Sequence, residues 1–239
     1  MVPWIGAQDP FPPVDRALRV PNGLLCAGAD LSVERLLEGY RSGIFPWYSG
    51  AEPILWWSPD PRMVLFCDEL RVSRSLAKSI RNEGYVVQID TAFRKVLAGC
   101  ASPRRDALAG GEAGTWLGEE MRAAYARLHR AGHAHSFECW HEGTLVGGLY
   151  GVAVGRMFYG ESMFSRRSDG SKVALTYLAR QLDRWRFVVI DCQMATGHLA
   201  SLGAREIPRD DFLGYVRTGA AQPAVAAPWR LDDDLMTDL

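Results

Sequence analysis

Two apolar segments that each lead into polar residues constrain the fold of this chain most strongly. Residues 156–159 (RMFY) lead into residues 160–165 (GESMFS), and residues 187–190 (FVVI) lead into residues 191–193 (DCQ). Continuous apolar runs of this length are typical of strands buried on both faces, and such strands end where a sheet opens. The sequence therefore predicts two neighbouring strands whose ends, Glu161 among them, form one acidic, amide-bearing pocket.

Length and composition place the chain among ordinary globular proteins. It has 239 residues, of which 48% are hydrophobic and 23% charged, enough for one large domain or two small ones. The net charge is −1, so the overall charge does not indicate a nucleic-acid partner. A local basic face is still compatible with this balance, because binding responds to the local field.

The five cysteines are odd in number, scattered and free of C-x-x-C pairs, which is typical of reduced thiols in a cytosolic protein. The first residues are rich in proline and lack the pattern of a signal peptide. No apolar run approaches the ~20 residues that a membrane-spanning helix needs. We therefore expect a soluble, cytoplasmic protein with no membrane partner.

The first sixty or so residues differ in composition from the rest. They are rich in Pro, Gly and Trp, and they contain one clear helix signal over residues 31–40, with Asp30 and Ser32 as candidate N-caps. We predict an α+β protein in which a small N-terminal α+β domain, residues 1–61, packs on a mixed-sheet domain, residues 62–219. The proline-containing tail, residues 220–239, is expected to be poorly ordered.

The second domain alternates between strand and helix patterns. The predicted strands are residues 62–67, 85–89, 136–140, 145–154, 156–159 and 187–192. The predicted helices are residues 72–82, 92–100, 119–130, 171–185 and 210–217.

Asp191 and Gln193 are the first candidates for chemistry. They are two residues apart, so on an extended backbone they share one face. A carboxylate can orient the neighbouring amide, or hold an incoming amine through charge-assisted hydrogen bonds. Such a pair alone is more often a strand end whose polar groups satisfy loop backbone. A second carboxylate, Glu161, favours a site for a cationic ligand, because two facing carboxylates are costly without one.

An apolar set is predicted beside these carboxylates. Residues 175, 178 and 182 share one helical face by the i, i+3, i+7 rule, and apolar side chains of the preceding strands are expected to face them. The set can be plain core, or it can be a socket for an apolar group of a ligand. Its members are Leu149, Phe158, Met163, Leu175, Leu178 and Leu182.

A helix face carries Arg74, Lys78 and Arg81 at i, i+4, i+7 spacing, with no acidic residue between Arg71 and Arg81 to pair with them. A run of charges on a helix is usually just a solvated face. This run has no acidic partners, which favours a role in phosphate binding. Trp47 and Trp116 lie in predicted loops, where tryptophans either fill a domain interface or stack a nucleobase.

Other motifs are discounted. His133, His135 and Cys139 have no second ligand cluster to complete a metal site, so no metal is expected. The sequence contains no Walker loop, no G-x-G-x-x-G and no G-x-S-x-G motif.

The chain resembles the leucyl/phenylalanyl-tRNA–protein transferase family from about Phe11 to Val216. The resemblance rests on many long blocks in one order, and the blocks at 160–165 and 191–193 are among them. The others are Pro21-Asn22-Gly23-Leu24-Leu25, Gly43-Ile44-Phe45-Pro46-Trp47, Trp56-Trp57-Ser58-Pro59-Asp60-Pro61-Arg62, Gly114-Thr115-Trp116, Gly132-His133-Ala134-His135-Ser136, Val146-Gly147-Gly148-Leu149-Tyr150-Gly151, Ser201-Leu202-Gly203-Ala204 and Glu206-Ile207-Pro208-Arg209.

The resemblance implies an acetyltransferase-like (GNAT-type) second domain and a cofactor-free reaction. A leucyl or phenylalanyl group, with methionyl as a further possibility, moves from its tRNA to a protein beginning with Arg or Lys, in the bacterial N-end rule pathway. By resemblance, Asp191, Gln193 and Glu161 lie in the active site, and Ser165 joins the apolar set as the side-chain socket. Trp47 and Trp116 match residues that contact the 3′ adenosine, and Arg74, Lys78 and Arg81 match a tRNA-binding cluster. DNA is not an implied partner.

Direct aminolysis of an activated ester needs alignment of the amine, loss of a proton and stabilisation of an oxyanion. A neutral amide is a very weak base, so we expect Gln193 to position the amine, and Asp191 to hold or polarise it. Proton relay through a tRNA hydroxyl is an alternative. Our hypothesis is that Glu161 and Asp191 also select a cationic acceptor. The rival functions are an acyl-CoA-dependent N-acetyltransferase and a non-catalytic tRNA-binding adaptor.

Overall fold

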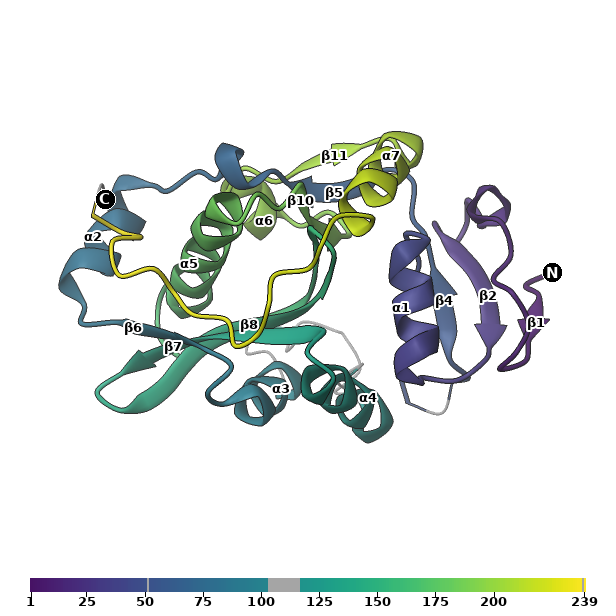
Figure 1. The fold of residues 1–239 in the computed structure, drawn as a ribbon, viewed down its shortest axis with the longest axis horizontal. Coiled ribbons are helices and arrows are strands. Elements are labelled where there is room, and N and C mark those ends of the chain that lie inside the picture. The colour runs from purple at the N-terminus through teal and green to yellow at the C-terminus, as the bar shows by residue number, and fades with distance from the viewer. Residues whose placement is uncertain (51, 103–116, 238) are drawn as a thin grey trace.

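The polypeptide forms two β-sheets, with most helices packed around the larger one (Figure 1). The computed structural model describes residues 1–50, 52–102, 117–237 and 239. The four-stranded sheet lies within residues 4–57, and the seven-stranded sheet uses strands between residues 62 and 207. This mixed-sheet α+β arrangement confirms the fold class predicted from the sequence.

The small sheet has the strand order β1-β2-β4-β3 and carries helix α1 (Val33–Arg41). Its strands are β1 (Trp4–Ile5), β2 (Leu24–Gly28), β3 (Phe45–Pro46) and β4 (Leu55–Trp57). The helix begins as the sequence predicts, because the Ser32 hydroxyl accepts a hydrogen bond from the Arg35 amide at 3.3 Å. Trp56 is fully buried and donates from its indole N–H to the Gly28 carbonyl at 3.0 Å, which joins β4 to β2.

The large sheet has the order β11-β5-β10-β9-β8-β7-β6. Strands β9 and β10 run parallel at its centre, and the other neighbours are antiparallel. Its strands are β5 (Arg62–Leu65), β6 (Val86–Ile89), β7 (Ala134–His141), β8 (Thr144–Val154), β9 (Met157–Ser165), β10 (Val189–Gln193) and β11 (Arg205–Ile207).

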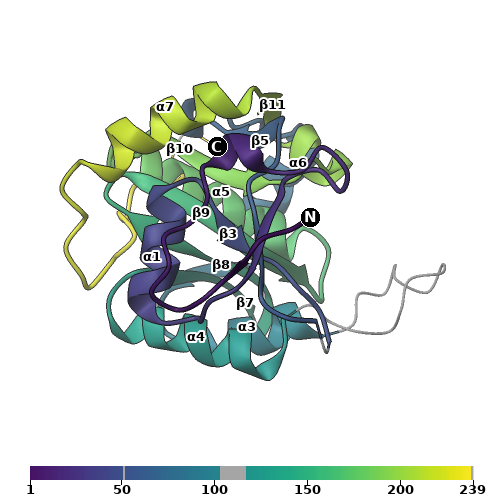
Figure 2. The same cartoon turned by 90° about the vertical axis from the view of Figure 1, so that its right-hand side faces the viewer.

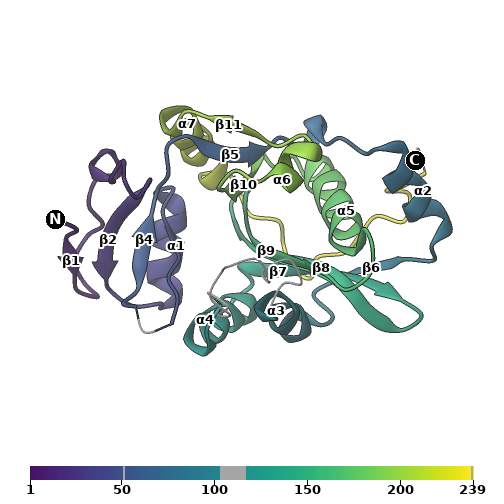
Figure 3. The same ribbon diagram turned by 180° about the vertical axis from the view of Figure 1, so that it is seen from behind.

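Helices cover both faces of this sheet. The long helix α5 (Gly170–Arg184) lies on one face, and α3 (Phe93–Ala101) and α4 (Glu119–Arg130) lie on the other (Figures 1 and 3). Buried side chains form two separate clusters accordingly, one beneath α5 and one shared by α3, α4 and the N-terminal sheet. The remaining helices are α2 (Arg74–Asn82), α6 (Gly197–Ser201), α7 (Arg209–Ala220) and two short 3₁₀ turns, η1 (Val14–Arg16) and η2 (Cys67–Glu69).

Helix α1 is the link between the two sheets. It contacts α4, α7 and β8, and Figure 2 shows it between α7 and α4. Tyr40, in the last turn of α1, is fully buried, and its carbonyl accepts a hydrogen bond from the Tyr159 hydroxyl of β9 at 2.7 Å. The last turn of α1 is therefore hydrogen-bonded to the central strand β9 of the large sheet.

Most predicted elements are present with small shifts at their ends. The helix over residues 119–130 has the predicted bounds, and its stripe from Met121 to Leu128 is buried. The cap of α2 is Ser73, as predicted. The prediction that β9 ends at Tyr159 is wrong, since this strand continues to Ser165. Residues 160–165 are therefore part of the strand and do not follow it.

The C-terminal tail differs from the poorly ordered segment that we expected. Trp229 is only 5% exposed, and its indole ring stacks on His135 of β7 with ring centroids 3.5 Å apart. It also meets the Trp185 ring edge-on at 4.9 Å, just after α5. The tail thus covers an aromatic surface between β7 and the end of α5, which its prolines and its acidic run do not reveal.

We expect Trp229→Ala to lower the free energy of unfolding by about 3 kcal/mol, because it removes a buried aromatic side chain. Val20→Ala, at a position that is 87% exposed, serves as the control and should change it by less than about 0.5 kcal/mol. Urea unfolding followed by circular dichroism measures both values. Equal effects of the two substitutions would contradict this packing of the tail.

Candidate functional site

A β-bulge in β9 sets the direction of the Glu161 side chain. In the β8–β9 ladder, Tyr150 pairs with Ser162 and Gly151 pairs with Gly160, so Glu161 is an extra residue with no partner. One extra residue inverts the alternation of side chains beyond it. As a result Glu161 faces α1 and α4, whereas Met163 packs under α5.

The two parallel strands β9 and β10 separate next to this bulge. Their ladder ends at the pair Asp191–Tyr159, and Gln193 has a left-handed backbone with a φ of 64°. A second register shift, between Asp191 and Gln193 opposite β5, accompanies the turn. Within the separation, the Gln193 side-chain amide donates to Glu161 Oε1 at 3.0 Å. The structure thus joins two of the predicted site residues directly.

Asp191 is held by an arginine that the sequence analysis did not single out. Arg62 of β5 donates to both carboxylate oxygens, from Nε at 2.8 Å and from Nη2 at 2.6 Å, and both side chains are fully buried. The guanidinium also donates to the Gly43 carbonyl at 3.2 Å and lies between the rings of Phe45 and Phe212. The expectation of two uncompensated carboxylates is therefore wrong, because the Asp191 charge is already neutralised.

Asp191 in turn fixes the residue after the turn. Its Oδ1 accepts a hydrogen bond from the Gln193 backbone N–H at 2.9 Å. Burial, reinforced by Asp191, raises the pKa of the intervening Cys192 thiol well above its usual range. A thiol of that kind is a poor nucleophile, so the cluster favours chemistry without a covalent intermediate on cysteine.

Glu161 is the buried carboxylate of the cluster that has no cationic partner. Tyr40 donates its hydroxyl to Oε1 at 2.8 Å, and Tyr125 of α4 donates to Oε2. Burial is the largest effect, and it outweighs these hydrogen bonds and raises the pKa of Glu161 from 4.5 to about 7. Burial also raises the pKa values of both tyrosines well above their usual range, so they remain donors.

The predicted apolar set forms one cluster. Leu149, Phe158 and the three helix leucines are buried together beneath α5, and Met163 packs against them. Ser165 is exposed, and its hydroxyl donates to the Ser171 hydroxyl at 2.9 Å. The cluster lies on the α5 face of the sheet, whereas Glu161 faces the opposite layer with α1 and α4.

The predicted basic helix lies apart from this cluster. Arg74, Lys78 and Arg81 on α2 are exposed, and none of them forms an ion pair with another residue in the described ranges. Figures 1 and 3 place α2 at the end of the molecule opposite to the N-terminal sheet. The helix therefore belongs to a surface, and it takes no part in the buried site.

The two predicted tryptophans have different outcomes. Trp47 is half-buried and meets the Trp57 ring edge-on at 5.4 Å, and the Trp57 indole donates to the Trp47 carbonyl at 2.6 Å. Trp116 lies outside the described residues.

Within the part of the chain that is described, no group of three or more His, Cys, Asp or Glu residues is arranged to hold a metal ion. In the same part, no helix has the length and apolar character needed to span a membrane.

Three functional residues were missed from the sequence: Arg62, Tyr40 and Tyr125. Arg62 ends the block WWSPDPR that carries the family resemblance, so a signal existed there. Tyr125 was assigned to a core stripe and Tyr40 to a helix end, and nothing in the local sequence shows that their hydroxyls meet, at 2.9 Å, above one carboxylate.

Comparison with known proteins gives one consistent result. Residues 64–217 match the family described as leucyl/phenylalanyl-tRNA protein transferase, and residues 29–60 match the N-terminal domain of the same family. A leucyl/phenylalanyl-tRNA–protein transferase of Chromobacterium violaceum is 57% identical over 96% of each chain. One of Thiobacillus denitrificans is 60% identical over 93% of this chain and 95% of its own.

Solved structures resemble the chain only distantly. The structure of L-PGS from Bacillus licheniformis is 16% identical with a TM-score of 0.41, over 68% of this chain and 52% of that one. A GCN5-related N-acetyltransferase-like protein from Streptococcus suis is 15% identical with a TM-score of 0.32, over 73% and 63% of the two chains.

The pKa of Glu161 predicts a pH-dependent stability. Because the folded-state pKa of about 7 exceeds the usual 4.5, folding favours the protonated acid. Its contribution is fully present below pH 4.5 and is lost as the pH rises to about 7. Relative to Glu161→Gln, the wild type should lose on the order of 3 kcal/mol of unfolding free energy across this window. Urea unfolding at several pH values measures the difference, and a pH-independent difference would contradict it.

Proposed function

The chain belongs to the leucyl/phenylalanyl-tRNA–protein transferase family, and we propose that it moves Leu or Phe from aminoacyl-tRNA to proteins that begin with Arg or Lys. The observation that carries the proposal is the chain of contacts from Arg62 through Asp191 and Gln193 to Glu161, inside the segment that matches the family. We place the reaction in the bacterial cytoplasm, in the N-end rule degradation pathway, and keep Met as a possible third donor.

The reaction is an aminolysis. The α-amine nitrogen of the acceptor forms a bond to the carbonyl carbon of the aminoacyl ester, and the bond between that carbon and the ribose oxygen breaks. The acceptor ammonium must lose one proton before its nitrogen can attack. A second proton leaves the nitrogen as the amide forms, and the departing ribose oxygen takes up a proton, so one proton is released overall. No energy source is needed, since the ester is already activated. The residues of the site have to align the amine and accept a proton.

Gln193 is assigned the positioning role. An ionised Glu161 can only accept hydrogen bonds, so the Gln193 amide presents its NH₂ group to that carboxylate. Its carbonyl oxygen is then free to accept a hydrogen bond from the incoming amine. Asp191, locked by Arg62, holds the Gln193 backbone in the left-handed turn that makes this possible.

Glu161 is assigned the proton-accepting role. A general base works best when its pKa is near the working pH, and the pKa of Glu161 is about 7. Asp191 is a poorer candidate, because the Arg62 guanidinium forms an ion pair with both of its oxygens, whereas Glu161 has only neutral donors. The two tyrosines keep their protons and hold the Glu161 carboxylate in one orientation. Relay through a ribose hydroxyl remains compatible with Glu161 as the final acceptor.

The other substrate parts are assigned by resemblance and burial. The apolar cluster beneath α5 would hold the Leu or Phe side chain, and Leu149 and Leu178 stand where relatives can carry Met and Phe. The half-buried Trp47, together with Trp116, would contact the terminal adenosine. The exposed cations of α2 would meet the acceptor arm of the tRNA.

The acyl-CoA rival needs an open phosphate site at the start of α5. That start is occupied by the protein itself: the Ser171 amide donates to the Ser165 hydroxyl at 2.8 Å, and the Asp169 carboxylate lies there, bonded to Ser79 of α2. A carboxylate at this position repels a pyrophosphate. The absence of a thermal shift with acetyl-CoA would weaken the rival further.

We expect transfer of labelled Leu from charged tRNA to an Arg-initiated peptide, and a fall in kcat of about 100-fold or more for Glu161→Gln. The wild-type rate should rise around pH 7 as Glu161 loses its proton, and the variant should lack this rise. Cys192→Ser is the matched control and should keep its activity. No transfer by the wild type would refute the proposed function, and an inactive Cys192→Ser would point instead to a cysteine intermediate.

The basic helix generates a separate prediction. Arg74→Ala combined with Lys78→Ala should raise the KM for charged tRNA and reduce the slope of log affinity against log salt by about 2, because two phosphate contacts are lost. Arg16→Ala with Arg19→Ala, two exposed cations of the N-terminal part, is the control. An unchanged KM and slope in the α2 variant would remove this helix from the tRNA interface.

A further inference from the structure

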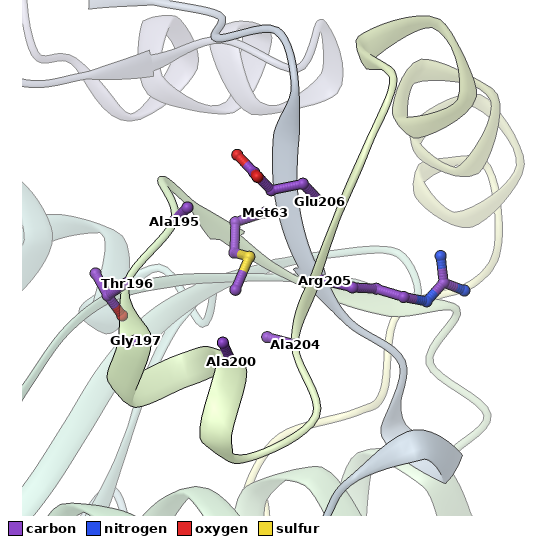
Figure 4. Close-up of a pocket in the computed structure, with 8 residues that line it drawn as sticks. All are labelled: Met63, Ala195, Thr196, Gly197, Ala200, Ala204, Arg205 and Glu206. Carbon is purple, nitrogen blue, oxygen red and sulfur yellow. The ribbon is translucent and has the colours of Figure 1, made fainter.

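A cavity of about 320 Å³ is lined partly by the loop that follows Gln193 in the sequence (Figure 4). One wall is the exposed loop that follows Gln193, with Ala195, and the floor is Met63 of β5. The opposite side is formed by Glu206 of β11 and by Ala204, the residue before that strand. No member of the predicted apolar set (Leu149, Phe158, Met163, Leu175, Leu178 and Leu182) and no residue of the basic helix α2 lines it, so the proposed assignment of the substrate parts leaves it without a role.

Strand register connects the cavity to the site. In β5, Met63 pairs with Gln193 of β10 on one side and with Glu206 of β11 on the other. Adjacent strands lie about 4.8 Å apart, so the Gln193 and Glu206 backbones are about 10 Å apart. An extended Lys or Arg side chain places its charge about 7 Å from its own α-amine, which is a similar reach.

The charge of the cavity comes from one residue. Arg205 and Glu206 are its charged lining residues, but Arg205 is bound to Glu69 at 3.0 Å and lies over the Phe66 ring. Figure 4 shows Arg205 extending away from Met63, whereas the Glu206 carboxylate lies beside Met63 and Ala195. Glu206 is exposed and forms no ion pair with another described residue.

We propose that this cavity, through Glu206, binds the cationic side chain of the acceptor's first residue while the α-amine of that residue lies at Gln193. The inference rests on the proposed function and adds the residue that selects the acceptor. It also replaces the hypothesis that Asp191 and Glu161 make this selection, because Arg62 neutralises Asp191 and Glu161 lies buried beneath Tyr40 and Tyr125. A small apolar floor suits the stem of Lys or Arg, and the rim carboxylate suits its charged end.

The test compares peptides that differ only in their first residue, Arg, Lys or the uncharged isostere citrulline, with leucyl-tRNA as donor. Glu206→Gln should raise the KM for the Arg- and Lys-initiated peptides about 5- to 10-fold, because a charge-assisted hydrogen bond is lost. The KM for leucyl-tRNA should stay unchanged, and the preference for Arg over citrulline should fall by the same factor. Glu206→Asp should restore part of the preference.

Glu142→Gln, which removes an 87%-exposed glutamate in the β7–β8 turn, is the matched control and should behave as the wild type. Ala200→Leu, which narrows the cavity without changing its charge, should raise the KM for both cationic peptides. If Glu206→Gln still transfers Leu and prefers the Arg peptide over the citrulline peptide as strongly as the wild type does, this inference is overturned and the proposed function is not. The absence of transfer by the wild-type protein would instead overturn the proposed function.

Discussion

The ion pair between Arg62 and Asp191 is the interaction on which the site depends. It is fully buried, it is bidentate, and it joins β5, the first strand after the N-terminal sheet, to β10 at the centre of the large sheet. Breaking such a pair by removing one partner leaves a buried charge, which costs about 3–5 kcal/mol. The guanidinium also binds the Gly43 carbonyl, so the same residue ties the N-terminal part of the chain to the strand that carries Gln193.

Because Asp191 has a cationic partner and Glu161 does not, the two carboxylates acquire different roles. Asp191 is bound by Arg62 and acts on the backbone of Gln193, while burial gives Glu161 a pKa of about 7 and leaves it able to exchange a proton near neutral pH. In the proposed mechanism the first carboxylate positions Gln193 and the second accepts the proton. The division follows from Arg62, which pairs with Asp191, and from the burial of Glu161 without a cationic partner.

The sequence predicted the elements well and the site only in part. Periodicity located α4 and the buried face of α5, and the pattern of apolar runs leading into polar residues singled out Asp191, Gln193 and Glu161 before the resemblance assigned them to an active site. The bulge at Glu161 could not be predicted, since it depends on the pairing of β9 with β8 and inverts the side-chain alternation between Glu161 and Met163. Arg62, Tyr40 and Tyr125 come from three distant segments and converge only through tertiary packing. For the same reason, the burial of Trp229 was missed in a tail that contains two prolines and an acidic run.

Selection of a cationic acceptor and acceptance of its proton place opposite demands on one carboxylate. A guanidinium bound to Glu161 would stabilise its ionised form and lower its pKa, and a weaker base would then face the amine. The structure offers a way to separate the two tasks, since Glu206 lies two strands from Gln193 and is exposed to solvent, where its charge is screened from the buried site. A cation held at Glu206 leaves the pKa of Glu161 to be set by burial, and the α-amine alone then approaches the proton acceptor.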